Sequence, residues 1–196
     1  MYEKIYSQIT DALVANGYIV VDNLFAPAMS KQLLTVAKNI TNYKQAGISH
    51  NSTIHVDRRR DKIYWIDPQN DASCKYLDFM EGLQNYLNRH LYLGIKFYES
   101  HFALYENGDF YEKHLDAFKS TKNRVVTTVY YLNEEYTKSC GGELLLYDAN
   151  DMQIQKIPPL MNRLVVFMSE MFPHEVLVSK TKRYSIAGWF RVDDKM

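Results

Sequence analysis

The chain has 196 residues, 23 basic and 23 acidic side chains, and 46% hydrophobic residues. This composition is typical of one soluble globular domain with a sizeable core. The balanced charge excludes a general electrostatic attraction to nucleic acid or to an anionic membrane, and we expect neither as a partner. No apolar run approaches the roughly 18 residues that a transmembrane helix requires.

The cysteine content points to a reducing compartment. Cys74 and Cys140 are the only cysteines, too few for a disulfide framework, and they do not form a CxxC pair. The first residues lack the basic segment and apolar core of a secretion signal. We therefore expect two reduced thiols in a cytoplasmic protein.

The first part of the chain, residues 1–92, is expected to be mainly helical. Apolar residues spaced by three and four predict helices over residues 2–16, 28–42 and 72–90. Short apolar runs predict strands at 18–21 and 62–67. Residues 44–62 are polar and aperiodic, which predicts a surface loop.

After residue 92 the sequence pattern changes to short strands separated by turn residues such as Asn107-Gly108 and Gly141-Gly142. The candidate strands are 95–105, 110–116, 124–132, 142–147, 154–157, 163–168, 174–179 and 183–191. Helices first and strands later predict an α+β fold. We expect a double-stranded β-helix (jelly-roll) core over 93–191, buttressed by the N-terminal helices, with 1–196 forming a single domain.

A candidate metal site follows from three residues. His114 and Asp116 stand two apart in a predicted strand, so both side chains point to one face. With the distant His174 they make two imidazoles and one carboxylate, the protein half of a facial-triad Fe(II) site. A lone His-x-Asp is often a local strand pair, and a lone histidine is more often structural. The combination favours a metal.

Arg183 is the candidate anion-binding residue. It heads an otherwise apolar strand, where a buried cation needs an acidic partner or ligand. Its guanidinium could bind a carboxylate through two hydrogen bonds. Alternation places Ser185, Ala187 and Trp189 on the same face, and the small residues leave room for a ligand. The bland alternative is an exposed arginine on an edge strand.

Six motifs follow one another along the second half of the chain: Tyr105-x-x-Gly108, His114-x-Asp116, Tyr130-Tyr131-Leu132-Asn133, Gly141-Gly142-Glu143-Leu144, Pro173-His174-Glu175-Val176, and Arg183-Tyr184-Ser185-Ile186 with Trp189. This order resembles the prolyl-4-hydroxylase branch of the 2-oxoglutarate- and Fe(II)-dependent dioxygenases. The segment 59–66 is similar to the strand and mobile loop before the core of the hypoxia-inducible-factor prolyl hydroxylases and their bacterial relatives. The resemblance covers about residues 55–191.

The resemblance implies a role for individual residues. It assigns Fe(II) to His114, Asp116 and His174, without further catalytic side chains. It assigns the 5-carboxylate of 2-oxoglutarate to Arg183 with Tyr131, and the region of the 1-carboxylate to Tyr105. Taken alone, each tyrosine is more often a core residue. Ala187 departs from the family, which has a hydroxyl residue that contacts the cosubstrate there.

The resemblance also implies a substrate loop over 44–66, in which 44–62 would act as a lid. The residues that it places around the substrate are Trp65, Arg59, Asp61, Arg124 and Trp189. Of these, Trp189 would lie near the iron. We expect Asp61 to belong to a mobile loop and to pair with Arg124 when that loop closes over a peptide.

The activity implied is Fe(II)- and 2-oxoglutarate-dependent hydroxylation of a prolyl residue in a peptide or protein. O2 would be consumed, succinate and CO2 would be the coproducts, and ascorbate would be a further cofactor. One alternative in the same fold is a hydroxylase of a free amino acid or another small molecule. The other is a noncatalytic jelly-roll binding module, which would not need the metal triad and Arg183 together.

Overall fold

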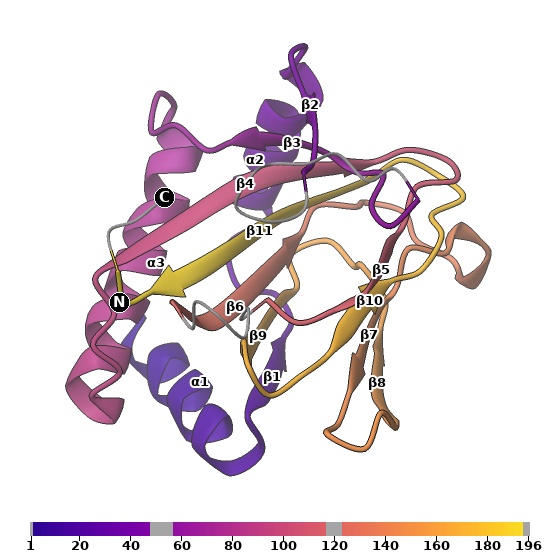
Figure 1. The fold of residues 1–196 in the computed structure, drawn as a ribbon. Coiled ribbons are helices and arrows are strands. Elements are labelled where there is room, and N and C mark those ends of the chain that lie inside the picture. Colours follow the sequence, from indigo (N-terminus) through magenta and orange to yellow (C-terminus); the bar gives the residue numbers. More distant parts are fainter. Residues whose placement is uncertain (1, 48–56, 117–122, 194–196) are drawn as a thin grey trace.

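The computed structural model describes residues 2–47, 57–116 and 123–193 of the chain (Figure 1). Its helices are α1 (Glu3–Asn16), α2 (Pro27–Asn39) and α3 (Asp71–Leu91). Its strands are β1 (Tyr18–Val21), β2 (Lys44–Gln45), β3 (Lys62–Trp65), β4 (Phe97–Tyr105), β5 (Tyr111–His114), β6 (Arg124–Tyr131), β7 (Leu144–Tyr147), β8 (Gln153–Ile157), β9 (Leu164–Met168), β10 (His174–Val176) and β11 (Arg183–Arg191).

Within the described residues the strands form two antiparallel sheets. The larger has seven strands in the order β1-β9-β6-β11-β4-β3-β2, and the smaller has four in the order β5-β10-β7-β8. The small sheet lies to one side of the large sheet, and the helices lie on the other side (Figure 1). The expected α+β fold, a double-stranded β-helix buttressed by N-terminal helices, is therefore confirmed.

The helices are defined by local signals that the sequence carries. Gly17 closes α1 in the left-handed conformation, with φ of 77°, and its N–H donates to Leu13. Pro27 begins α2. The side chain of Asn70 caps α3 by accepting a hydrogen bond from the N–H of Ser73. These signals set where each helix begins and ends, and therefore which of its apolar residues can pack against the sheet.

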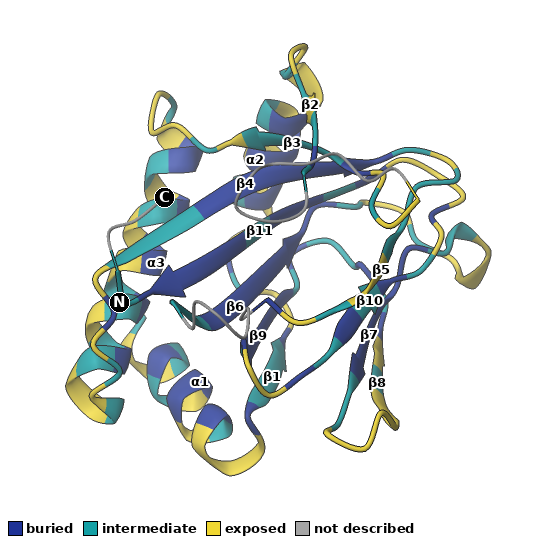
Figure 2. Ribbon diagram, in the orientation of Figure 1, coloured by how far each residue is buried: buried dark blue, intermediate teal, exposed yellow. Residues whose placement is uncertain are grey.

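The helices and the outer face of the large sheet share the main hydrophobic core. That core includes Tyr76, Phe79 and Leu83 of α3 together with Ile186 and Phe190 of β11. The central strands of the large sheet are buried along most of their length (Figure 2). A second, smaller cluster, which includes Ala103, Tyr105, Val129 and Tyr131, lies on the opposite, inner face.

Alternation along β11 separates these two environments. Tyr184, Ile186 and Phe190 pack with the helices. Arg183 donates a hydrogen bond to Ser185 on the other face of the strand. The predicted alternation therefore places the candidate ligand-binding residues between the sheets and the apolar residues under the helices.

Several element boundaries differ from the sequence predictions. The strand expected to reach residue 116 ends at His114, so Asp116 lies just after β5. The strand expected over 174–179 ends at Val176, because the chain then turns and Ser179 N–H donates to Asp109 on another segment.

Part of the predicted loop 44–62 falls outside the described residues. Among the helices that the structure describes, none is long and apolar enough to cross a membrane.

A tight contact in the outer core generates a stability prediction. A Cβ added at Gly188 would overlap the hydroxyl of Tyr98, which is hydrogen-bonded to Tyr76 and Thr128. We expect Gly188→Ala to lower the free energy of unfolding by about 1–3 kcal/mol, measured by urea denaturation. Tyr98→Leu removes both the hydroxyl and the ring atoms that a Cβ at Gly188 would overlap, so the double variant should lose less than the sum of the single losses. Strict additivity would contradict this packing.

Candidate metal centre and ligand site

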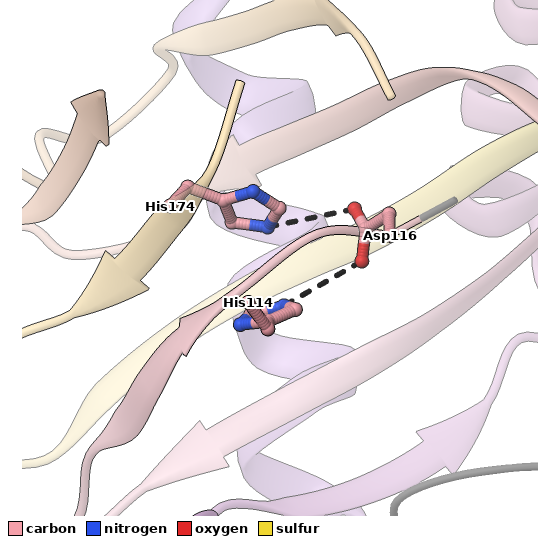
Figure 3. Close-up of side chains that lie close together, drawn as sticks. All are labelled: His114, Asp116 and His174. Atoms are coloured by element: carbon pink, nitrogen blue, oxygen red, sulfur yellow. Dashed lines mark ion pairs between the residues drawn. The ribbon is translucent and has the colours of Figure 1, made fainter. Parts of the chain in front are cut away.

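Two histidines and one aspartate converge between the sheets. His114 ends β5, Asp116 follows it, and His174 begins β10, directly opposite His114 in the strand register. The Nε2 atoms of His114 and His174 each lie 3.5 Å from a different carboxylate oxygen of Asp116 (Figure 3). The three potential ligand atoms lie within 4.8 Å of one another. The three predicted ligands therefore surround one point.

The tautomers of both imidazoles are fixed by the backbone. The Nδ1 atom of His114 lies 2.8 Å from the carbonyl oxygen of Glu112, and that of His174 lies 3.0 Å from the carbonyl oxygen of Phe172. A carbonyl oxygen only accepts, so each neutral ring carries its proton on Nδ1. Each Nε2 lone pair then faces an oxygen of Asp116. A cation between them would turn this unfavourable arrangement into coordination.

The protonation states also fit a metal. Burial, together with nearby His114, lowers the pKa of His174 to about 4 against the opposing effect of Asp116. Burial alone would raise the pKa of Asp116, but the attraction of the two histidine rings in their protonated form, together with Arg124, holds it well below its usual value. Near neutral pH the site therefore offers a buried carboxylate and a neutral imidazole, the forms that bind metal.

Side chains behind the triad hold it in place. Thr127 of β6 donates a hydrogen bond of 2.8 Å to Asp116, and its oxygen lies 2.8 Å from that of Ser169. The ring of Tyr111 stacks on His114 at 3.6 Å between centroids. The guanidinium of Arg59 lies over the Tyr111 ring, 4.4 Å from its centroid. The sequence analysis missed Thr127, Ser169 and Tyr111. The available signal was a hydroxyl facing inward from an apolar strand.

Arg183 lies on the inner face as a buried cation, 3% exposed. Its Nε donates to the carbonyl of Gly142 at 2.8 Å and its Nη1 to Ser185 at 3.1 Å. Its Nη2 and the hydroxyl of Tyr131 are buried without a hydrogen-bond partner in the described chain. The rings of Tyr105 and Tyr131 flank the guanidinium at 4.7 and 5.0 Å.

These groups fit the distal carboxylate of a dicarboxylate. Among the described residues Arg183 makes no ion pair, and a buried cation without one is costly. An incoming carboxylate would accept from both Arg183 Nη2 and Tyr131. Gly142 is required beside them, because a Cβ there would lie 2.8 Å from the Arg183 side chain. Ala103 and Ala187 follow Arg183 on this part of the sheet, and their short side chains take up little space beside it.

The predicted entrance residues Trp65, Arg124 and Trp189 gather at the other end of this face. Trp65 is half-exposed and Trp189 is buried. The Arg124 guanidinium lies 3.8 Å from the Trp189 ring centroid and donates to Glu99. His101 contacts both tryptophans. Sequence reasoning did not identify Glu99 or His101.

The expectation that Asp61 lies in an exposed loop was wrong. Asp61 is fully buried and pairs with Arg59 at 2.5 and 2.9 Å. Its pairing with Arg124 on closure over a peptide stays a prediction. Arg59 is close in sequence and is itself placed by a bridge to Tyr111, whereas Arg124 is already bound by Glu99. The residues of the expected lid at 48–56 lie outside the described part.

We expect Thr127→Val to weaken divalent-metal binding about 10–100-fold, because the carboxylate of Asp116 loses the hydrogen bond that orients it. Anaerobic calorimetry with Fe(II) measures this change. Thr127→Ser keeps the hydroxyl and should bind metal nearly as tightly as the parent. Equal affinity of the valine and serine variants would show that Thr127 does not orient Asp116.

The metal-free protein should lose stability as the pH falls from about 6.5 toward 4. Over this range an unfolded His174 takes up a proton that the buried, folded imidazole with its pKa of about 4 excludes. The contribution is fully retained above pH 6.5, and the loss reaches about 3 kcal/mol at the lower end. Urea denaturation at several pH values measures it. His174→Gln cannot titrate, so its stability should fall less steeply than that of the parent.

Comparison with known proteins agrees with this geometry. The family model described as "2OG-Fe(II) oxygenase superfamily" matches residues 100–191. Egl nine homolog 1 of Homo sapiens is 31% identical over 152 residues, which is 73% of this chain and 35% of that protein. The hypoxia-inducible factor prolyl hydroxylase of Caenorhabditis elegans is 31% identical over 89% of this chain and 26% of its own length. The chain thus spans only about a quarter to a third of the length of these curated relatives.

Two solved structures resemble nearly the whole chain. A prolyl-4-hydroxylase of Pseudomonas putida has a TM-score of 0.88 and 33% identity, covering 95% of this chain and 99% of that one. A prolyl hydroxylase from Trichoplax adhaerens, in complex with a hypoxia inducible factor peptide fragment, has a TM-score of 0.87 and 27% identity over 96% and 90% of the two chains. With this similarity in sequence and fold, and with the metal triad in place, the chain belongs to the 2OG-Fe(II) oxygenase superfamily.

Proposed function

We propose that this chain is an Fe(II)- and 2-oxoglutarate-dependent dioxygenase that hydroxylates a prolyl residue in a peptide or protein. The observation that carries the proposal is that one inner face holds two sites that each lack a ligand, one for a metal and one for an anion. The triad offers metal ligands around one point, and Arg183 with Tyr131 offers buried donors that lack an acceptor. A metal and a dicarboxylate complete both sites at once.

The protein's part in the reaction is to bind and orient. His114, Asp116 and His174 would hold Fe(II) and leave its other coordination positions open. The bound metal, with 2-oxoglutarate and O2, supplies the oxidising chemistry, which yields succinate and CO2 with the hydroxylated product. Arg183 would anchor the distal carboxylate of 2-oxoglutarate, and Tyr131 would donate a second hydrogen bond.

The substrate assignment rests on similarity and on the entrance. The relative from Caenorhabditis elegans and the two similar structures are prolyl hydroxylases, and one of the structures holds a peptide fragment. Trp65, with 52% of its surface exposed, gives the entrance an aromatic surface suited to a peptide segment. The main alternative is hydroxylation of a free amino acid, which the same metal and cosubstrate sites would support.

The compartment and the accessory cofactor are further parts of the proposal. Cys74 and Cys140 are both free, which supports a reducing, cytoplasmic location. Ascorbate as an additional cofactor is supported only by the family resemblance. It would be shown by sustained turnover when ascorbate is added to the iron-loaded protein.

A succinate-release assay tests the proposed function. The metal-loaded protein would be given 2-oxoglutarate, O2 and a panel of peptides capped at both ends, each with one central proline. Each peptide has a matched partner with alanine in place of proline, and free L-proline is assayed beside them. We expect release that depends on the proline. Stimulation by free proline alone would replace the peptide substrate with a small molecule, and no stimulation by any of these would refute prolyl hydroxylation.

Arg183→Lys keeps the charge but loses the planar fork, so we expect the apparent KM for 2-oxoglutarate to rise about tenfold or more. Arg183→Ala should raise it further, because the anchoring cation is gone. Arg89→Lys is a matched control, since Arg89 is exposed in the last turn of α3. Unchanged 2-oxoglutarate kinetics in both Arg183 variants would place the anchor elsewhere.

A further inference from the structure

His101 occupies a distinctive position on the inner face. It lies on β4, opposite Ala187 of β11 and Trp65 of β3. Its ring lies between the only two tryptophans of the chain, 5.2 Å from Trp65 and 5.3 Å from Trp189 between centroids. Only 2% of the residue is exposed. The histidine is therefore a buried residue of this face that contacts both tryptophans.

Neither ring nitrogen of His101 has a hydrogen-bond partner within the described residues. The same holds for Nε1 of its neighbour Trp189. A buried donor or acceptor that is left unsatisfied destabilises the folded protein. Two such side chains in contact, on adjacent strands, are expected where a ligand supplies the missing partners.

The charge state of His101 defines what it can bind. Burial lowers the pKa of His101 well below its usual value, and Arg59 and Arg124 lower it further, against the opposing effect of Asp116. The ring is therefore neutral, with one nitrogen that donates and one that accepts. Trp189 Nε1 can only donate. Together the two side chains offer two donors and one acceptor.

The surroundings hold this pair rigidly. The guanidinium of Arg124 covers the Trp189 ring at 3.8 Å and is fixed by hydrogen bonds of 3.1 and 3.3 Å to Glu99. Glu99 also accepts from Arg191, so its carboxylate is held on both sides. A ligand that binds His101 and Trp189 would thus meet groups already in position, with little ordering cost.

The position also agrees with the site of reaction. Thr127, the residue opposite Trp189 on β6, is the one that binds Asp116. The His101–Trp189 pair therefore lies at the metal end of the inner face, whereas Arg183 and Tyr131 lie toward the other end of β11 and β6. A molecule held by this pair would be a neighbour of the metal and separate from the 2-oxoglutarate anchor.

We propose that His101 and Trp189 form a hydrogen-bonding subsite for an acceptor oxygen of the substrate, adjacent to the carbon that reacts. This inference rests on the proposed function. A proline within a peptide has no N–H, so its recognisable polar groups are backbone carbonyl oxygens. A free amino acid would present a carboxylate oxygen to the same donors. His101 is thus a substrate-binding residue, and its role is specificity.

Binding without turnover tests the proposal. The Fe(II)- and 2-oxoglutarate-loaded protein is kept free of oxygen and titrated with two probes: the most active capped prolyl peptide of the panel, and free L-proline. Intrinsic fluorescence is the readout, because both tryptophans of the chain contact His101. The variants are His101→Phe, which keeps the ring contacts without nitrogens, and His101→Gln, which keeps a donor and an acceptor. His90→Phe, at the exposed end of α3, is the matched control.

We expect His101→Phe to raise the Kd for the probe that the parent binds about tenfold, with partial recovery in His101→Gln. The Kd for 2-oxoglutarate should stay near that of the parent. A phenylalanine variant that fails to fold would lose 2-oxoglutarate binding, and the glutamine variant then decides by its own probe affinity against that of His90→Phe. Binding of the capped peptide assigns the oxygen to a backbone carbonyl, and binding of free proline alone assigns it to a carboxylate.

Two results would overturn the inference, and they are distinguishable. If the parent binds a probe and the His101 variants bind it equally well, the subsite is refuted while the proposed function stands. If the assay panel and free proline give no succinate release and no binding to the parent, the proposed function fails and the subsite fails with it.

Discussion

The strict alternation of β11 is the constraint on which both halves of the molecule depend. This strand lies between β4 and β6 and pairs with both along most of its length. Its outward residues Ile186 and Phe190 complete the core beneath the helices, while Arg183 and Trp189 face the small sheet. A slip of one residue would exchange the two sets. It would bury a guanidinium under the helices and expose apolar side chains to the ligand site.

The buried charged side chains differ in whether the protein itself supplies an oppositely charged partner. Asp61 is matched by Arg59, and Glu99 by Arg124 and Arg191, so those pairs are complete within the protein. Asp116 and Arg183 differ, because Asp116 faces two imidazole rings and Arg183 bonds only to hydroxyl and carbonyl oxygens. Since unpaired buried charges are unfavourable, these two positions are where an added cation and an added anion would stabilise the fold most.

Local patterns made much of the fold and the metal site predictable. His114 and Asp116 could be paired from strand geometry, and the helix ends from Asn16-Gly17 and Pro27. The unpredicted contacts join distant segments. Thr127 of β6 donates to Asp116 across eleven residues of sequence, and Arg124 pairs with Glu99 of β4. Which distant side chains form such contacts depends on the three-dimensional arrangement of the strands. The periodicity of the sequence does not encode this arrangement.

The neighbouring residues Tyr130 and Tyr131 show how the fold separates structure from function. Both are fully buried. The Tyr130 hydroxyl, on the helix side, lies 2.7 Å from that of Ser30 and donates to Asn162. The Tyr131 hydroxyl, one residue on and therefore on the opposite face, has no partner among the described residues. Evenly satisfied tyrosines would indicate a packed core on both faces. Of these two tyrosines, the one without a partner is the one on the ligand side. The energetic cost of its unsatisfied hydroxyl is recovered when a ligand binds, and this contributes to ligand affinity.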